Sequence, residues 1–283
     1  MNVAEPMTLA QDTRLRYRDI KPEIGAEILA DKHALLSGVH AEEIRELLGA
    51  KGVLVFPQVH FTDDEQIAFT HTLGKFAPEI YGEQIYKITL DESLNPTAKY
   101  LHGTFNWHFD GFMNRVPILA SILASKVLPP SGGNTEFANT YAAYDALPDD
   151  RKKQLEGLRA VHALAATQLY LNPEPSYETF MEWRAVGRRE LPLVWAHESG
   201  RKSLVIGSSA HAILGMDPLD GTELLVWLRD WATQDRFHYS HKWSVGDVVM
   251  WDNTGSLHRA LPYPKDCGRL LHRTKLEGEE PLN

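Results

Sequence analysis

Two histidines and one aspartate are the residues of this sequence that could together hold a metal ion. His108 and Asp110 are separated by one residue and lie among aromatic residues, Trp107 and Phe112 included, in a segment typical of an extended chain. On a strand, residues i and i+2 point to the same face, so this imidazole and this carboxylate can bind one ion. His258, just after a predicted turn, offers a third ligand. Two histidines and a carboxylate on one face are the ligand set of non-haem Fe(II) oxygenases, which keeps positions open for a co-substrate and O2.

A second histidine–carboxylate pair has the same spacing but a different setting. His40 and Glu42 open a segment in which Ile44, Leu47 and Leu48 recur at helical spacing. Residues i and i+2 on a helix do not face each other. We therefore interpret His40 as a solvated helix residue and not as a metal ligand.

Two other interpretations of the first pair remain open from the residues alone. A buried His258 could be satisfied by a backbone carbonyl and have no ligand role. Two histidines and a carboxylate also suit catalytic zinc, as in a hydrolase.

Composition excludes several classes of protein. The 283 residues are 24% charged and 43% hydrophobic, as in ordinary globular chains, and the formal charge of −9 argues against nucleic-acid binding. No apolar run approaches the roughly 18 residues that would cross a membrane. A single cysteine, Cys267, excludes an internal disulfide. The first eleven residues have neither a basic residue nor an apolar core, so we expect no signal peptide and a cytoplasmic location.

The elements that must position these side chains are predicted to be mostly short strands. Residues 53–56 form an apolar run before Pro57, which indicates a buried strand, and residues 116–128 indicate a strand covered on both faces. Thr62 followed by Glu65 has the pattern of a helix capping box. Apolar residues at helical spacing predict an amphipathic helix over 223–232.

The last fifty residues predict a meander of strands over 237–243, 247–252, 256–261 and 269–276, with glycines between them. About eight core strands with flanking helices favour a mainly β fold, a double-stranded β-helix of the jelly-roll or cupin-like kind. No linker interrupts the chain, so we expect one domain over 1–283. Residues 166–190 lack periodicity and indicate either a lid over a site or a surface excursion.

Several motifs, in order and at the right spacing from about residue 45 to 278, give the chain a family resemblance. It resembles the Fe(II)- and 2-oxoglutarate-dependent dioxygenases of the taurine and dichlorophenoxyacetate dioxygenase group. The matching segments are 107–110 (WHFD), 130–137 (PSGGNTEF), 142–148 (AAYDALP), 199–204 (SGRKSL), 246–253 (GDVVMWDN) and 269–273 (RLLHR).

The resemblance implies a ligand set and a reaction. His108, Asp110 and His258 would bind Fe(II), and Thr135 and Arg269 would hold the far carboxylate of 2-oxoglutarate. An arginine suits that task because its planar fork binds a buried carboxylate through two hydrogen bonds. The enzyme would hydroxylate an unactivated C–H bond with O2 and release succinate and CO2. The carboxylate of Asp110 favours hydroxylation over halogenation.

The resemblance also suggests a small, anionic substrate. Arg273 lies four residues after Arg269 on the same strand and therefore on the same face, where it could bind the anion. Tyr81, Thr104, Phe105 and Phe112 would border the pocket, and this aromatic set favours an aryloxyalkanoate. The alternatives are an alkyl sulfonate or sulfate, a secondary metabolite, or a non-catalytic cupin-like binding protein. Relatives form dimers or tetramers, so we expect a homo-oligomer that binds neither nucleic acid nor membranes.

Overall fold

A large mixed sheet forms one wall of the molecule. The computed structural model describes residues 14–79 and 82–283. The strand order in this sheet is β1-β2-β3-β14-β6-β16-β4, with β5 also paired to β16, and only the β2–β3 pair is parallel. Its strands are β1 (Tyr17–Asp19), β2 (Ala26–Ile28), β3 (Val53–Phe56), β4 (Phe76–Ala77), β5 (Tyr86–Ile88), β6 (Ala120–Val127), β14 (Val248–Asp252) and β16 (Leu270–Leu276).

Three smaller antiparallel sheets complete the β structure of the described residues. The sheet β13-β7-β15 contains β7 (Thr135–Asn139), β13 (His238–His241) and β15 (Ser256–Ala260). The sheet β12-β8-β9 contains β8 (Arg159–Ala163), β9 (Arg188–Pro192) and β12 (Ala210–Ile213). The last pairs β10 (Val194–Ala196) with β11 (Lys202–Leu204).

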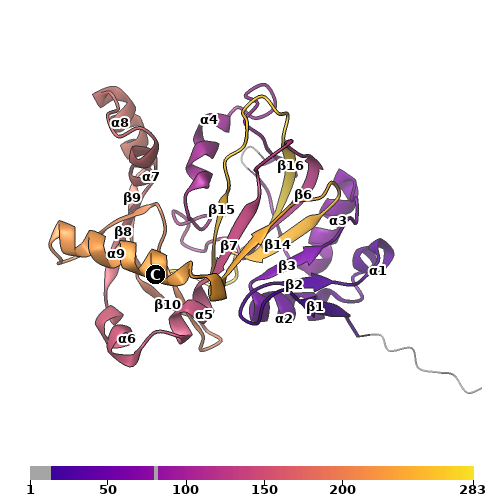
Figure 1. The fold of residues 1–283 in the computed structure, drawn as a ribbon, viewed down its shortest axis with the longest axis horizontal. Coiled ribbons are helices and arrows are strands. Elements are labelled where there is room, and N and C mark those ends of the chain that lie inside the picture. Colours follow the sequence, from indigo (N-terminus) through magenta and orange to yellow (C-terminus); the bar gives the residue numbers. More distant parts are fainter. Residues whose placement is uncertain (1–13, 80–81) are drawn as a thin grey trace, which may run out of the picture.

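The β13-β7-β15 sheet lies beside the large sheet (Figure 1), and side chains of both sheets form one hydrophobic core. Val55, Leu123 and Trp251 come from the large sheet, whereas Phe137 comes from β7. Alternate residues of β3, such as Phe56, point the other way into a second core. Because β3 is buried on both faces, its sequence is a continuous apolar run and not an alternating one.

Helices cover the outer surfaces of these sheets (Figure 1). Leu35, Ile44 and Phe69, from α1, α2 and α3, fill the second core against the large sheet. The helices are α1 (Lys32–Ser37), α2 (Ala41–Lys51), α3 (Asp63–Leu73), α4 (Ala98–Leu101), α5 (Thr140–Asp145), α6 (Asp149–Leu155), α7 (Leu164–Leu171), α8 (Tyr177–Ala185), α9 (Pro218–Ala232) and the 3-10 turns η2 (His102–Phe105) and η3 (Asp235–Phe237). Within the described ranges, no helix is long and apolar enough to span a bilayer.

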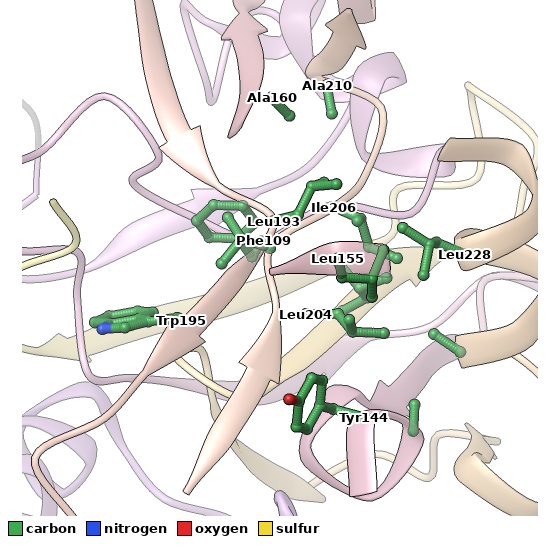
Figure 2. Close-up of a cluster of buried hydrophobic side chains, with 14 of the residues drawn as sticks. Phe109, Tyr144, Leu155, Ala160, Leu193, Trp195, Leu204, Ile206, Ala210 and Leu228 are labelled. Atoms are coloured by element: carbon green, nitrogen blue, oxygen red, sulfur yellow. The ribbon is translucent and has the colours of Figure 1, made fainter. Parts of the chain in front are cut away.

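A third core lies on the far side of the β13-β7-β15 sheet. It brings together side chains from distant parts of the chain, among them Tyr144 of α5, Leu204 of β11 and Leu228 of α9 (Figure 2). Phe109 also points into this core (Figure 2). The core therefore anchors the short segment that carries His108 and Asp110.

The structure confirms most of the predicted elements and corrects two. The strand 53–56, the capping box of Thr62 and Glu65 and the helix over 223–232 are present, although that helix begins earlier, at Pro218. The last four strands do not form a meander, because β13 and β15 pair with β7 whereas β14 and β16 pair with β6. Residues 166–190 are not irregular: they contain most of α7, all of α8 and the start of β9.

Candidate metal centre

The three predicted ligands lie together at one point between the two facing sheets. One donor atom from each of His108, Asp110 and His258 lies within 4.8 Å of the other two. Each histidine Nε2 is 3.8 Å from a different Asp110 oxygen, and the two imidazole centroids are 4.1 Å apart. Two imidazole nitrogens and a carboxylate at this spacing fit one divalent ion on a single face.

Backbone pairing brings the two histidines together across 150 positions of sequence. His108 and His258 form an isolated antiparallel bridge, in which each backbone N–H donates to the other's carbonyl, at 3.1 and 2.8 Å. The extended stretch predicted around His108 is short, since Asp110 already begins a turn with Gly111 at φ +76°. The two side chains nevertheless converge, because Trp107 and Phe109 are anchored in the third core on the opposite face.

A hydrogen bond to His108 and ring packing against His258 set the orientation of these ligands. The Nδ1–H of His108 donates to the carbonyl of Asn106 at 2.9 Å, which leaves Nε2 as the lone-pair nitrogen that faces Asp110. The ring of His258 packs against Trp251, with centroids 4.7 Å apart, so Trp251 supports the site as a packing residue.

The electrostatics of the site favour metal binding. Burial raises the pKa of Asp110, but the neighbouring His258, Arg273 and His108 outweigh burial and lower that pKa to about 2. Burial lowers the pKa of His258 to about 3, and the neighbouring His108 adds to this effect. At neutral pH the carboxylate is therefore ionised and His258 is neutral, the forms in which both groups bind metals.

A buried cation lies where the resemblance places the far carboxylate of 2-oxoglutarate. Arg269 is 2% exposed, and its Nη2 donates to the carbonyl of Gly133 at 3.1 Å. Its Nε and Nη1 are buried and have no hydrogen-bond partner in the described part of the chain, and burial lowers the pKa of its guanidinium. Unpaired buried donors are costly, so this guanidinium fits a ligand that carries a carboxylate.

The loop beside Arg269 is shaped for close approach. Gly133 has φ +74°, and a Cβ there would lie 3.1 Å from Arg269 Nε and 2.9 Å from a Pro129 side-chain carbon. Thr135 follows at the start of β7 and is also buried, with its hydroxyl oxygen accepting a hydrogen bond from Trp243 Nε1 at 3.0 Å. Because that acceptor position is occupied, the Thr135 hydroxyl proton is available to a ligand.

Arg273, the arginine predicted to bind an anionic substrate, already forms an ion pair within the protein. Its Nε and Nη2 each donate to one oxygen of the buried Glu79 at 3.0 Å, and its Nη1 is 3.4 Å from Asp110 Oδ2. Burial lowers the pKa of Arg273, but Glu79 and Asp110 outweigh burial and raise it. Arg273 therefore borders the metal centre with only part of its guanidinium open.

The remaining pocket candidates lie in different surroundings. Phe105 contacts the ring of Tyr263, which in turn lies 4.5 Å from the Arg269 guanidinium. Phe112 packs on His162 beside the third core, and the Thr104 hydroxyl of η2 donates to the Leu101 carbonyl at the end of α4. Tyr81 lies outside the described residues.

His40 is not a metal ligand and is not a solvated helix residue either. It is the residue before α2, and its side chain is only 13% exposed. Its ring pairs with Glu43 at 2.9 Å, so the second histidine–carboxylate spacing has a local structural use.

Three residues of the site were missed by sequence reasoning. Glu79 is hydrogen-bonded to Arg273, and Trp243 is hydrogen-bonded to Thr135. The side chain of Asn253 is hydrogen-bonded to the backbone of Asp110. Asn253 lies in the motif 246–253 that carries the resemblance, which was the available signal for it. Glu79 and Trp243 lie in no recognised motif.

Comparison with known proteins gives a consistent result. The family model for taurine catabolism dioxygenase TauD, TfdA family, matches residues 16–275. An alpha-ketoglutarate-dependent 2,4-dichlorophenoxyacetate dioxygenase of Cupriavidus pinatubonensis is 37% identical, covering 86% of this chain and 90% of that protein. An (S)-phenoxypropionate/alpha-ketoglutarate-dioxygenase of Sphingobium herbicidovorans is 36% identical, covering 80% of this chain and 82% of that protein. An alpha-ketoglutarate-dependent sulfate ester dioxygenase of Pseudomonas putida is 30% identical, covering 100% of this chain and 96% of that protein.

Solved structures match over nearly the whole chain. The crystal structure of AAD-2 in complex with Mn(II) and N-oxalylglycine superposes with a TM-score of 0.80 at 31% identity, covering 95% of this chain and 99% of that one. A putative alpha-ketoglutarate-dependent 2,4-D dioxygenase from Burkholderia xenovorans gives a TM-score of 0.76 at 33% identity, with 94% and 98% covered.

Proposed function

Since this chain belongs to the TauD, TfdA family of dioxygenases, we propose that it hydroxylates a small aryloxyalkanoate-like acid. The chain is an Fe(II)- and 2-oxoglutarate-dependent dioxygenase. When bound, the iron and its co-substrate supply the oxidation of a C–H bond by O2, with 2-oxoglutarate leaving as succinate and CO2. The sheet-rich fold with its flanking helices is the scaffold of that chemistry.

The proposed ligand residues are His108, Asp110 and His258 for iron. The observation that carries this assignment is the convergence of their donor atoms within 4.8 Å. For 2-oxoglutarate we propose Arg269 and Thr135. The unpaired donors of Arg269 support this, because a carboxylate there would complete a buried charge-assisted pair.

The substrate assignment rests on the relatives and on one partly buried cation, Arg273. Two of the relatives named above act on phenoxy acids by their printed names, at 36–37% identity. Arg273 is partly buried beside Asp110 and could receive the substrate's carboxylate, and Phe105 is a candidate contact for its ring. Hydroxylation of the carbon next to the ether oxygen would then release a phenol. A sulfate ester is the second candidate, supported by the 30% identical relative.

The finer features of the architecture stay proposals as well. We propose that the two facing sheets form a jelly roll, and that residues 1–283 make up one dioxygenase domain. Residues 166–190, which contain most of α7 and all of α8, are the proposed lid. Light scattering with size-exclusion chromatography would test the expected homo-oligomer. A cytoplasmic location stays a prediction, for which cell fractionation is the test.

A substrate panel tests the proposed function. Purified protein with Fe(II), ascorbate, O2 and 2-oxoglutarate is incubated with phenoxyacetates, 2-phenoxypropionates, alkyl sulfates and alkyl sulfonates, and succinate is measured. We expect succinate above the substrate-free background with the phenoxy acids, with an equal amount of phenol. Sulfate or sulfite release would move the assignment to the alternative. Product formation without O2 would contradict the dioxygenase reaction.

A further inference from the structure

A cluster of three charged side chains, one of them fully buried, lies next to the metal centre. It consists of Glu79, Arg273 and Lys275. The Glu79 carboxylate is 1% exposed and accepts two hydrogen bonds from Arg273 at 3.0 Å, and Lys275 Nζ lies 2.8 Å from its Oε2. The side chains of Arg273 and Lys275 are 18% and 14% exposed.

The fold dictates this cluster. Arg273 and Lys275 alternate with His272 and Thr274 along β16, so both cations point to the face that carries Leu271 and the shared core. Lys275 pairs with Ala77 of β4, which places Glu79, two residues later, over the same face. The Glu79 backbone is held by hydrogen bonds with Gly82 and Glu83.

The cluster leaves only one edge of Arg273 open. Its Nε–Nη2 edge is closed by Glu79, and its Nη1 approaches Asp110 at 3.4 Å. Tyr86 lies against the guanidinium, 4.9 Å from ring centroid to carbon, and its hydroxyl is hydrogen-bonded to Thr97. An anionic group can therefore meet Arg273 only at the outer Nη edge.

The charges of the cluster explain why Lys275 is needed. Arg273 with Glu79 alone is a neutral pair, and a neutral pair attracts an anion weakly. Lys275 adds a second cation to the same carboxylate, which brings the three side chains to a net charge of +1. Asp110, 3.4 Å from Arg273 Nη1, is a further anion beside the cluster, so without Lys275 the anions around Arg273 would outnumber the cations and would repel an anionic ligand.

We propose that Glu79 and Lys275 are positioning residues that make the substrate site selective for an anionic group over a neutral one. Glu79 holds Arg273 with its outer edge toward the metal centre, and Lys275 balances Glu79 so that Arg273 keeps its charge for the substrate. This inference rests on the proposed function and deepens it, because it names the charge of the group that the site accepts.

Four proteins test the inference: wild type, Lys275→Met, Glu79→Gln and the double variant, whose clusters have formal charges of +1, 0, +2 and +1. Isothermal titration calorimetry under anaerobic conditions, with Fe(II) and 2-oxoglutarate present, gives the Kd of phenoxyacetate and of its neutral amide. We expect Lys275→Met to raise the Kd of the acid by about tenfold or more while leaving that of the amide within about twofold. The double variant should recover part of the loss, since its net charge is restored although Glu79 no longer holds Arg273 as firmly.

The outcomes separate this inference from the proposed function. The inference is overturned if wild type binds the acid no better than the amide, if Lys275→Met leaves the acid's Kd unchanged, or if the double variant binds the acid no better than Lys275→Met. A merely structural role predicts the last of these, because two disrupted contacts are worse than one. The proposed function fails separately if the acid binds to wild type but produces no succinate with O2.

Discussion

Asn253 binds both backbone polar groups of Asp110. The Asp110 N–H donates to Asn253 Oδ1 at 2.7 Å, and Asn253 Nδ2 donates to the Asp110 carbonyl at 2.8 Å and to the Ile118 carbonyl at 3.2 Å. The side chain thus makes the contacts that a neighbouring strand would make, at the point where the extended segment turns. Asn253 is 1% exposed, so these bonds are shielded from water.

Replacing Asn253 by Asp is predicted to weaken metal binding. An aspartate of the same shape cannot donate to the two carbonyls, and it adds a negative charge that must be buried. We expect the Kd for Co(II), measured by its visible absorption, to rise by about tenfold or more. Asn172→Asp, a substitution on the surface, is the matched control and should leave that Kd unchanged. Equal Co(II) affinity in both variants would refute the role given to Asn253.

Arg269→Lys is predicted to impair 2-oxoglutarate binding while preserving the charge. Lysine lacks the planar fork that can use two donors toward one carboxylate. We expect the KM for 2-oxoglutarate to rise by about tenfold or more, measured by succinate release. Arg18→Lys, at a side chain that is 70% exposed, serves as the control. A KM in Arg269→Lys that stays at the wild-type value would contradict the assignment of Arg269.

Trp243→Phe is predicted to act through Thr135. The substitution keeps a buried aromatic ring but removes the N–H that occupies the Thr135 oxygen at 3.0 Å. A lost hydrogen bond of this kind is worth about 1 kcal/mol, so the Kd for 2-oxoglutarate should rise about fivefold. Thr135→Val should also raise that Kd, and the double variant should add little to Thr135→Val. Fully additive effects would mean that Trp243 does not work through Thr135.

Much of the metal centre could be predicted from sequence, because the residues that indicate it are close neighbours in the chain or belong to short motifs. The one-residue spacing of His108 and Asp110 predicts a shared face, and the family motifs placed His258 and Arg269. The structure brings the three ligand candidates together. Strand positions near the C-terminus were also predictable, since apolar runs between glycines carry that information.

Pairing between distant strands was not predictable from the residues. β13 to β16 are consecutive, yet they alternate between two sheets, and nothing local distinguishes this from a meander. Likewise, Glu79 meets Arg273 across 194 positions, so its burial depends on the register of β4 with β16. The helices in 166–190 were missed because Pro173 and Pro175, between α7 and α8, interrupt the pattern that each helix would show alone.

His162 is predicted to make the fold sensitive to acid. Burial lowers its pKa from 6.5 to about 3, and the nearby His211 contributes in the same direction. The folded protein therefore keeps His162 neutral, whereas the unfolded chain takes up its proton as the pH falls below about 6.5. This group should reduce the free energy of unfolding by about 1.4 kcal/mol per pH unit between these two pKa values.

Urea unfolding of the metal-free protein measures this effect. Between pH 7.5 and pH 5, wild type should lose about 2 kcal/mol more unfolding free energy than His162→Gln, which has no ionisable group there. The other buried histidines are common to both proteins and cancel in the comparison. Equal losses in the two proteins would show that His162 is not held neutral by the fold.

The most direct test of the account is the visible spectrum of the protein mixed with Fe(II) and 2-oxoglutarate in the absence of O2. Wild type should show the weak charge-transfer band of 2-oxoglutarate bound to iron, and His108→Ala should lose it while remaining folded by circular dichroism. The surface variant His33→Ala should retain the band. A band that survives unchanged in His108→Ala would contradict the proposed iron site, and with it the mechanism built on His108, Asp110 and His258.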